Sequence, residues 1–409
     1  AKGYWEVNLK ALEAGGPYQL QITGKDNQIS IKDILIGDVW LCSGQSNMQW
    51  VVNNVTNAEV EKKNANYSQI RTLNIPRRME LSPKDTISTT WLVCSPETIG
   101  RFSGVAYFFA RKVYEETNIP IGIINSSWGG TIVETWTSLE AANTLPQKRL
   151  DRYNKNEKLS PPTEYFTRTN KEAKRNDYPS LVYNAMIHPL LSFAIKGVVW
   201  YQGENNVGNA EPYTDWLTCM ISDWRNRWNS ELPFYIIQLP NFDSTNKTPL
   251  WAEIRDAQRK VLTVPKTHLI VTSDLGDPHD LHPRNKQEVG MRVALQVLHH
   301  EYGRPDIVSE SPMFERMEIN GDKIIITFKN TGSGLEIRSR YGCLQGFTIA
   351  GEDKKFYWAQ GELKDNRIVI WNPKVPNPIA VRYNWENNPD GNLYNKDGLP
   401  ACLFRTDNW

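Results

Sequence analysis

Between residues 37 and 302 the chain alternates short apolar runs with amphipathic stretches, and this rhythm restricts the possible folds more than any other feature. The apolar runs predict strands at 37–42, 69–73, 121–126, 197–202, 234–239 and 268–273. Helical spacing of apolar residues lies between several of them, as in 102–113, 211–228 and 251–263. Strands that alternate with helices favour a parallel sheet covered by helices. We therefore expect an α/β fold with helices on both faces of a parallel central sheet.

The two ends of the chain follow a different pattern. Residues 1–36 form short alternating runs separated by turn residues, and residues 303–409 return to β-like runs such as KIIITFKN and NRIVIWN. Both patterns indicate antiparallel β structure. We predict an N-terminal β segment at 1–36, which is part of a truncated β-sandwich module, an α/β domain at 37–302, and a C-terminal β-rich domain at 303–409.

One long polar stretch interrupts the α/β rhythm. Residues 143–180 are charged and show no clear period. The plain interpretation is a solvent-exposed insertion. A lid near a functional site is the alternative, because the stretch begins after one strand with a polar end and finishes before another.

Composition excludes several classes of function. The formal net charge is +1, so no electrostatic feature favours a nucleic acid or a membrane surface as partner. No apolar run reaches 18 residues, which argues against insertion into a membrane. The five cysteines include no CxxC pair, which argues against a zinc site or a dense disulfide framework. No signal peptide is present, and the chain opens within a strand-like pattern, as a mature or truncated protein would.

The stretch GDVWLCSGQSNMQW at 37–50 gives the first candidate for chemistry. Its apolar run stops abruptly at small polar residues, among them Gly44 and Ser46. A tight turn from a strand into a helix raises a hydroxyl above the sheet and aims backbone N–H groups at a ligand, and Gly44 permits the unusual backbone that this requires. Ser46 is therefore a candidate nucleophile, against the plainer interpretation of a structural serine in a glycine-containing turn.

Two further strand ends carry groups that suit a developing negative charge. The run NSSWGGT places Gly129 and Gly130 after a strand, where glycine lets a backbone N–H approach a ligand closely. The run WYQGENN places the amides of Gln202 and Asn205 after another strand, although a helix-capping loop would look the same. Carboxyl ends of parallel strands meet at one edge of the sheet, so we expect these groups near Ser46.

A fourth strand end, DLGDPHDLHPRN at 274–285, combines histidines with carboxylates. A serine nucleophile needs a base and an orienting carboxylate, and both residue types occur here. A metal site formed by His279, Asp280 and His282 is the competing interpretation. No additional Cys or His cluster completes such a site, so metal binding is the weaker of the two.

Taken together, the four strand ends resemble the SGNH (GDSL-like) hydrolases, and among them the sialate O-acetylesterase family. The resemblance rests on GDVWLCSGQSNM, SSWGGT, YNAMIHPLLSFAIKGVVWYQGENN, DPHDLHPRNKQEVG and NLYNKDGLPACLFRTDNW. It implies a three-layer α/β/α fold in which Ser46 is the nucleophile and His282 the base. Neither a metal nor an organic cofactor is implied.

Two positions depart from the wider pattern of these hydrolases. Where many of them carry an aspartate three residues before the base, this chain has His279. Asp280 is the favoured orienting carboxylate, with Asp277 as the alternative, and a serine–histidine dyad assisted by a backbone carbonyl stays open. The expected oxyanion donors are the N–H groups of Ser46 and of Gly129 or Gly130, with Gln202 in the place where other members use an asparagine.

The resemblance predicts a secreted or periplasmic serine esterase that removes O-acetyl groups from sugars through an acetyl-serine intermediate. O-acetylated sialic acid is the expected substrate, and acetylated plant polysaccharide such as xylan is the first alternative. A carbohydrate-binding protein with a vestigial triad is the alternative from another class. The carboxylate of a sialic acid would favour a nearby cation, for which Arg284 and Arg101 are candidates. The residues expected around the substrate are Gln45, Asn47, Glu204, Asn205 and Arg284.

Overall fold

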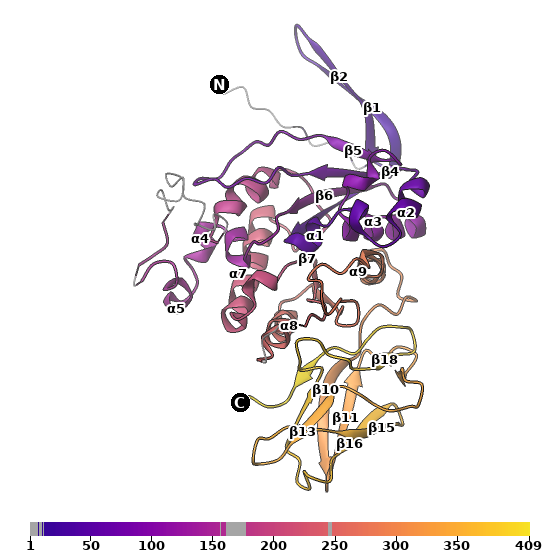
Figure 1. The fold of residues 1–409 in the computed structure, drawn as a ribbon. Helices are drawn as coiled ribbons and strands as arrows, with labels where there is room; N and C mark the ends of the chain where they lie inside the picture. The colour runs from indigo at the N-terminus through magenta and orange to yellow at the C-terminus, as the bar shows by residue number, and fades with distance from the viewer. Residues whose placement is uncertain (1–6, 8–9, 11, 156, 161–176, 244–247) are drawn as a thin grey trace.

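A seven-stranded sheet forms the centre of the molecule in the computed structural model, which describes residues 7, 10, 12–155, 157–160, 177–243 and 248–409 (Figure 1). The strands lie in the order β5-β4-β6-β3-β7-β8-β9. All neighbours are parallel except β4 and β5. Their bounds are β3 Asp38–Gly44, β4 Tyr67–Asn74, β5 Trp91–Cys94, β6 Ile121–Ser127, β7 Gly197–Tyr201, β8 Phe234–Ile237 and β9 Thr267–Ile270. The expected parallel sheet is confirmed.

Helices cover both faces of this sheet. Two of them, α3 (Gly104–Thr117) and α9 (Lys286–Glu301), pack together on one face, and α7 (Ala210–Trp228) and α8 (Leu250–Lys260) cover the other (Figure 1). Burial on both faces explains why the central strands are apolar runs rather than alternating ones. The shorter helices are α1 Ser46–Gln49, α2 Ala58–Asn64, α4 Leu139–Ala142 and α5 Gln147–Leu150.

The strand order places a crevice at the middle of the sheet. β3 lies between β6 and β7, so the connection from β6 to β7 passes from one side of β3 to the other. In open α/β sheets, ligands bind outside the carboxyl ends of the strands at such a switch point. The carboxyl ends of β3, β6 and β7 therefore form the part of the fold that positions a site.

The C-terminal part is a β-sandwich. Two four-stranded antiparallel sheets, β10-β11-β16-β15 and β14-β13-β17-β19, share one apolar core, and β12 pairs with β18. The bounds are β10 Met313–Asn320, β11 Lys323–Lys329, β12 Leu335–Ile337, β13 Phe347–Ala350, β14 Tyr357–Trp358, β15 Gln360–Lys364, β16 Arg367–Trp371, β17 Ala380–Tyr383, β18 Leu393–Asn395 and β19 Phe404–Arg405.

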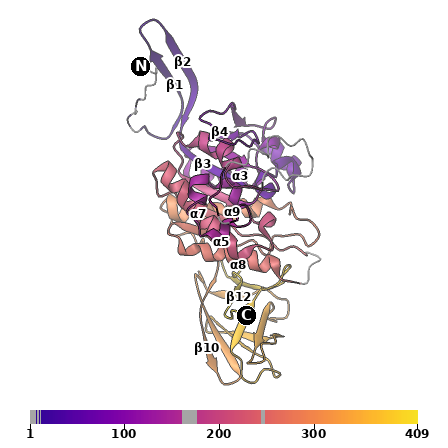
Figure 2. The same ribbon diagram turned by 90° about the vertical axis from the view of Figure 1, so that its left-hand side faces the viewer.

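The N-terminal strands form an antiparallel hairpin. β1 (Gly15–Thr23) pairs with β2 (Gln28–Ile36), and only Gly37 separates β2 from the central strand β3. The hairpin projects from the α/β domain at the end opposite the C-terminal sandwich (Figure 1 and Figure 2).

Three further expectations concern the polar stretch, membrane insertion and the cysteines. The polar stretch 143–180 includes α5, while its residues 161–176 lie outside the described part. Among the described residues, no helix combines the length and the apolarity that crossing a membrane requires. All five cysteines are free thiols.

Candidate active site

The turn that carries Ser46 is fixed by its contact with β7. Gly44 has φ +134°, and a Cβ at this position would lie 2.1 Å from the carbonyl oxygen of Tyr201. The N–H of Gln45 donates to the same oxygen at 3.0 Å. The chain then enters α1, whose first residue is Ser46, and the N–H groups of Met48 and Gln49 both donate to the carbonyl of Gln45. The turn therefore presents the hydroxyl of Ser46 at the carboxyl end of β3, on a backbone that its own hydrogen bonds hold.

His282 reaches this hydroxyl from the loop that follows β9. Its Nε2 lies 2.8 Å from Ser46 Oγ, within hydrogen-bond distance. The indole of Trp50 stacks on the imidazole, with ring centroids 4.9 Å apart and planes 12° from parallel. Burial, together with the positive charge of Lys286, lowers the pKa of His282 below its usual value. The ring is therefore held in place and kept in the neutral form that can accept a proton.

The two carboxylates expected to orient His282 lie differently. Asp280 Oδ1 accepts the backbone N–H of His282 at 2.8 Å and lies 3.8 Å from its Nδ1. Asp277 Oδ1 instead accepts the backbone N–H of His279 at 2.8 Å. A separation of 3.8 Å is longer than a hydrogen bond, although such contacts are often loose before substrate binds. Asp280 is thus the carboxylate beside the imidazole.

The metal interpretation of this loop finds no geometric support. His279 is exposed, while His282 faces Ser46 and Trp50. Within the described residues, the side chains of His279, Asp280 and His282 do not converge as a set of ligands.

Gly129 lies directly against Ser46. A Cβ built on it would be 3.2 Å from the Cβ of Ser46, which explains the need for glycine. Its N–H donates to Gln49 Oε1 at 2.8 Å. Gly130 has φ +77° and open space around it, and its carbonyl accepts a hydrogen bond from Asn205 Nδ2 at 2.6 Å. The N–H of Gly129 is therefore near the reacting oxygen but is held by a side-chain amide.

The expectation for Gln202 requires a correction. Its side chain is fully buried, and Nε2 donates to protein acceptors, namely Gln45 Oε1 at 3.2 Å, Thr131 O at 3.0 Å and Asn206 Oδ1 at 2.7 Å. An amide with two N–H groups has none left for a ligand in this arrangement. Asn205, three residues further along, is exposed, and among the described residues its side-chain amide donates to the carbonyl of Gly130 alone. The amide that this loop offers to a ligand is that of Asn205.

The fully buried side chain of Asn47 links three segments behind the nucleophile. Its Nδ2 donates to Glu204 Oε1 at 2.5 Å and to the carbonyl of Leu281 at 3.0 Å. Its Oδ1 accepts a hydrogen bond from Lys286 Nζ. Burial lowers the pKa of Lys286 to about 7 and raises the pKa of the Glu204 carboxyl. This buried network ties the loop of His282 to the ends of β3 and β7.

The residues expected around the substrate fall into two groups. Gln45, Asn47 and Glu204 are tied into hydrogen bonds within the protein, so they support the site from behind. Asn205 and Arg284 are exposed.

The cationic candidates are both at the surface. Arg284 Nε donates to the carbonyl of Asn54 at 3.0 Å, close to the loop of His282. Arg101 is exposed.

Three contributors were missed from sequence: Gln49, Trp50 and Lys286. Gln49 and Trp50 lie in the same motif as Ser46. Gln49 contacts Gly129 and Trp50 contacts His282, and both partners lie so far away in the sequence that the motif gave no sign of these contacts. Lys286 lies four residues after His282, where a lysine at the start of a helix ordinarily faces solvent.

We expect the imidazole of His282 to titrate below the usual value of about 6.5. Lys286→Met should raise this pKa, because removing a buried positive charge makes the protonated imidazole less unfavourable. Arg284→Gln is the matched control, since an exposed cation is screened by solvent and should have little effect. The measurement is an NMR titration of the ring, assigned by loss of its signal in His282→Ala. An unchanged or lower pKa in Lys286→Met would contradict the role given to Lys286.

Comparison with known proteins places the chain in a family. A family model described as carbohydrate esterase, sialic acid-specific acetylesterase, matches residues 36–299. The chain is 32% identical over 355 residues to sialate O-acetylesterase of Homo sapiens, an alignment that covers 78% of this chain and 64% of that protein. The protein of that name from Mus musculus is 29% identical over 435 residues, with 94% and 80% covered. The chain thus spans a little under two thirds of the human relative.

A solved structure agrees with this placement. The crystal structure of a carbohydrate acetylesterase from Xanthomonas citri is 37% identical, with a TM-score of 0.89, and the match covers 99% of this chain and 88% of that one. The likeness therefore includes the hairpin and the C-terminal sandwich as well as the α/β domain. The chain belongs to the sialic acid-specific acetylesterase family of carbohydrate esterases.

Proposed function

We propose that the protein is a serine esterase that removes O-acetyl groups from sugars, with O-acetylated sialic acid as substrate. The observation that carries the proposal is the 2.8 Å contact between Ser46 Oγ and His282 Nε2 at the carboxyl ends of the central strands. A hydroxyl paired with a partly buried imidazole is the arrangement that activates serine as a nucleophile. Membership of the family supports the choice of an acetylated sugar.

In the first half of the reaction, Ser46 Oγ attacks the carbonyl carbon of the acetyl ester while His282 Nε2 takes the hydroxyl proton. The carbonyl oxygen becomes an oxyanion. Collapse of this tetrahedral species breaks the bond to the sugar oxygen, which receives the proton from His282. The products are the deacetylated sugar and an acetyl-serine.

In the second half, water replaces the sugar. His282 removes a proton from the water as its oxygen attacks the acetyl-serine carbonyl, and the proton then passes to Ser46 Oγ as acetate leaves. Asp280, beside Nδ1, holds the ring and stabilises the imidazolium that forms in each half.

The oxyanion is stabilised by the N–H groups of Ser46 and Gly129 and by the amide of Asn205. Asn205 replaces Gln202 in this set because the Gln202 amide is bonded within the protein. Gln49 must release the N–H of Gly129 before an ester oxygen can take its place. Each well-placed donor is worth about 3 kcal/mol of barrier.

A sialic acid differs from a neutral sugar by its carboxylate. Arg284, exposed two residues after His282, offers the guanidinium that such a group would select. Acetylated xylan is the alternative substrate, and sugar binding without turnover is the alternative from another class. With this substrate we infer a secreted or periplasmic location.

The test of the proposal is release of acetate from O-acetylated sialic acid and from an acetylated xylo-oligosaccharide. The wild-type protein should hydrolyse both, with the higher kcat/KM on the sialic acid. Ser46→Ala should abolish release from each, because no other group can form the acetyl intermediate. Turnover by Ser46→Ala would rule out the nucleophile. A preference for the xylo-oligosaccharide would rule out the substrate, and no turnover of either by wild type would favour the binding protein.

His282 rather than His279 is predicted to be the base. His282→Ala should lower kcat by about three orders of magnitude or more, as loss of a triad base does. His279→Ala is the matched control on the same loop and should cost about tenfold or less, because this side chain is exposed. Both are measured on one acetyl ester. A large loss of kcat in His279→Ala together with near wild-type kcat in His282→Ala would reverse the assignment.

The correction at the amide position leads to a separate prediction. Asn205→Ala should lower kcat by about a hundredfold with little change in KM or in melting temperature, because an exposed transition-state donor is lost. Gln202→Ala should lower the melting temperature, since it leaves buried acceptors unpaired, while the folded fraction keeps kcat within about tenfold. Steady-state kinetics and thermal unfolding of both variants check this. The opposite pattern would restore Gln202 as the donor.

A further inference from the structure

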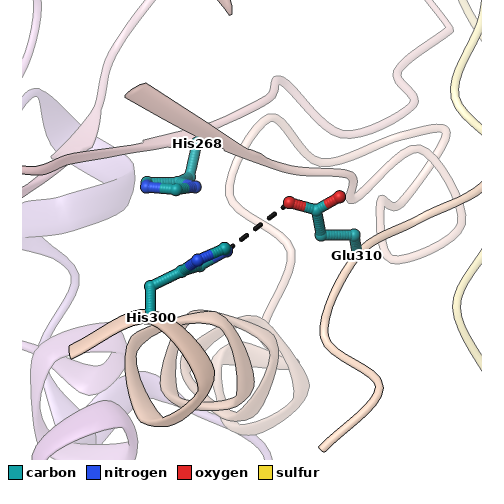
Figure 3. Close-up of side chains that lie close together, drawn as sticks. All are labelled: His268, His300 and Glu310. Atoms are coloured by element: carbon teal, nitrogen blue, oxygen red, sulfur yellow. Dashed lines mark ion pairs between the residues drawn. The ribbon is translucent and has the colours of Figure 1, made fainter. Parts of the chain in front are cut away.

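Three side chains with metal-binding groups meet at the opposite end of the sheet from Ser46. His268 is the second residue of β9, His300 lies in the last turn of α9, and Glu310 lies in the segment that connects α9 to β10 (Figure 3). One donor atom from each residue lies within 4.8 Å of the other two. The cluster is built on the amino end of its strand, so it is separate from the site at the carboxyl ends.

The spacing of these donors suits a shared ion. His300 Nε2 lies 3.5 Å from Glu310 Oε1, longer than the 2.7–2.9 Å usual for a charged hydrogen bond. Two ligands bound tetrahedrally to one zinc ion, each at about 2.1 Å, lie about 3.4 Å apart. The rings of His268 and His300 face each other with centroids 4.1 Å apart. Since all three donor atoms lie within 4.8 Å of one another, small side-chain movements would bring them to this spacing.

An ion pair between His300 and Glu310 would account for the positions of these two side chains but not for that of His268. Within the described residues, neither ring nitrogen of His268 has a protein hydrogen bond, and its ring stacks on Tyr235 at 4.9 Å. A ring nitrogen of His268 is therefore available to an ion that also contacts His300 and Glu310.

Neighbouring contacts hold the ligands in position. Tyr235 stacks on the ring of His268 and holds it in place. The hydroxyl of Tyr235 in turn donates to Glu301 Oε1 at 3.2 Å. His299, next to His300, contacts the carbonyl of Ile307 through Nδ1 at 2.9 Å and so anchors the connecting segment to the end of α9. Such supporting contacts orient metal ligands in known sites.

We propose that His268, His300 and Glu310 bind a divalent transition-metal ion of the zinc type, with water completing four-coordination. Two imidazoles and one carboxylate suit zinc better than magnesium or calcium, which take oxygen ligands. The ion joins β9, α9 and the connector to the C-terminal sandwich. Its role is to stabilise the junction of the two domains, and the esterase chemistry does not pass through it.

The first test is the zinc content of the full chain, purified without a metal-affinity tag, equilibrated with Zn²⁺ and then desalted. Wild type should keep about one ion per chain, and His300→Ala and Glu310→Gln should keep less than about a tenth of that. His279→Ala, which alters the loop of the esterase site, should keep the wild-type amount. A wild type without zinc, a wild-type content in His300→Ala, or loss of zinc in His279→Ala would each overturn the proposal.

The second test is thermal unfolding with Zn²⁺ against unfolding with a chelator. Zinc should raise the melting temperature of wild type by a few degrees and leave that of Glu310→Gln unchanged, because an ion that binds only the folded state stabilises it. An equal rise in Glu310→Gln would overturn the proposal. Release of acetate by His300→Ala should match wild type, so a failure of the zinc site is distinguished from a failure of the esterase function.

Discussion

The side chain of Asn47 is the contact on which the arrangement of the site depends. It bonds at once to Glu204 beyond β7, to the carbonyl of Leu281 beside His282, and to Lys286 at the start of α9. The partners come from two segments, the end of β7 and the stretch from the loop of His282 into α9, and all are buried or partly buried. One atom of this network stays unpaired, because Glu204 Oε2 is buried and has no hydrogen-bond partner among the described residues. The bonds that Asn47 does make fix the relative position of the three segments, and with it the distance between Ser46 and His282.

Much of the fold could be predicted because burial leaves a simple signal in the sequence. Strands such as 121–126 and 197–202 are apolar throughout, as expected where helices cover both faces, and their bounds in the structure agree within one or two residues. The side on which each helix packs is not encoded in such runs. It depends on the crossing of the chain from β6 to β7, which only the three-dimensional structure shows.

The site was less predictable, because its residues interact over long distances in sequence. Gln202 and Asn205 lie three residues apart in one polar run after β7. The side chain of Asn205 is exposed and that of Gln202 is buried, and the run itself does not tell which of the two faces outward. The buried state of Lys286 depends on partners 82 and 239 positions away in sequence, Glu204 and Asn47, and the helical pattern around it gives no hint of them. The prediction that Ser46 and His282 lie close together came from the family resemblance. Their positions after two strands of one parallel sheet made it physically reasonable.

The hydrogen bond from the Gly129 N–H to Gln49 has a consequence for affinity. In the mechanism proposed above, an ester oxygen takes the N–H that the side chain of Gln49 now holds, so the two compete for it. The observed affinity of any ligand using this donor is its intrinsic affinity reduced by the fraction of molecules in which Gln49 has moved away. A small ester or a free anion gains too little elsewhere to displace the side chain. Under the proposed mechanism, a substrate held also through its sugar brings the extra binding energy, so the contact with Gln49 would favour large substrates over small ones.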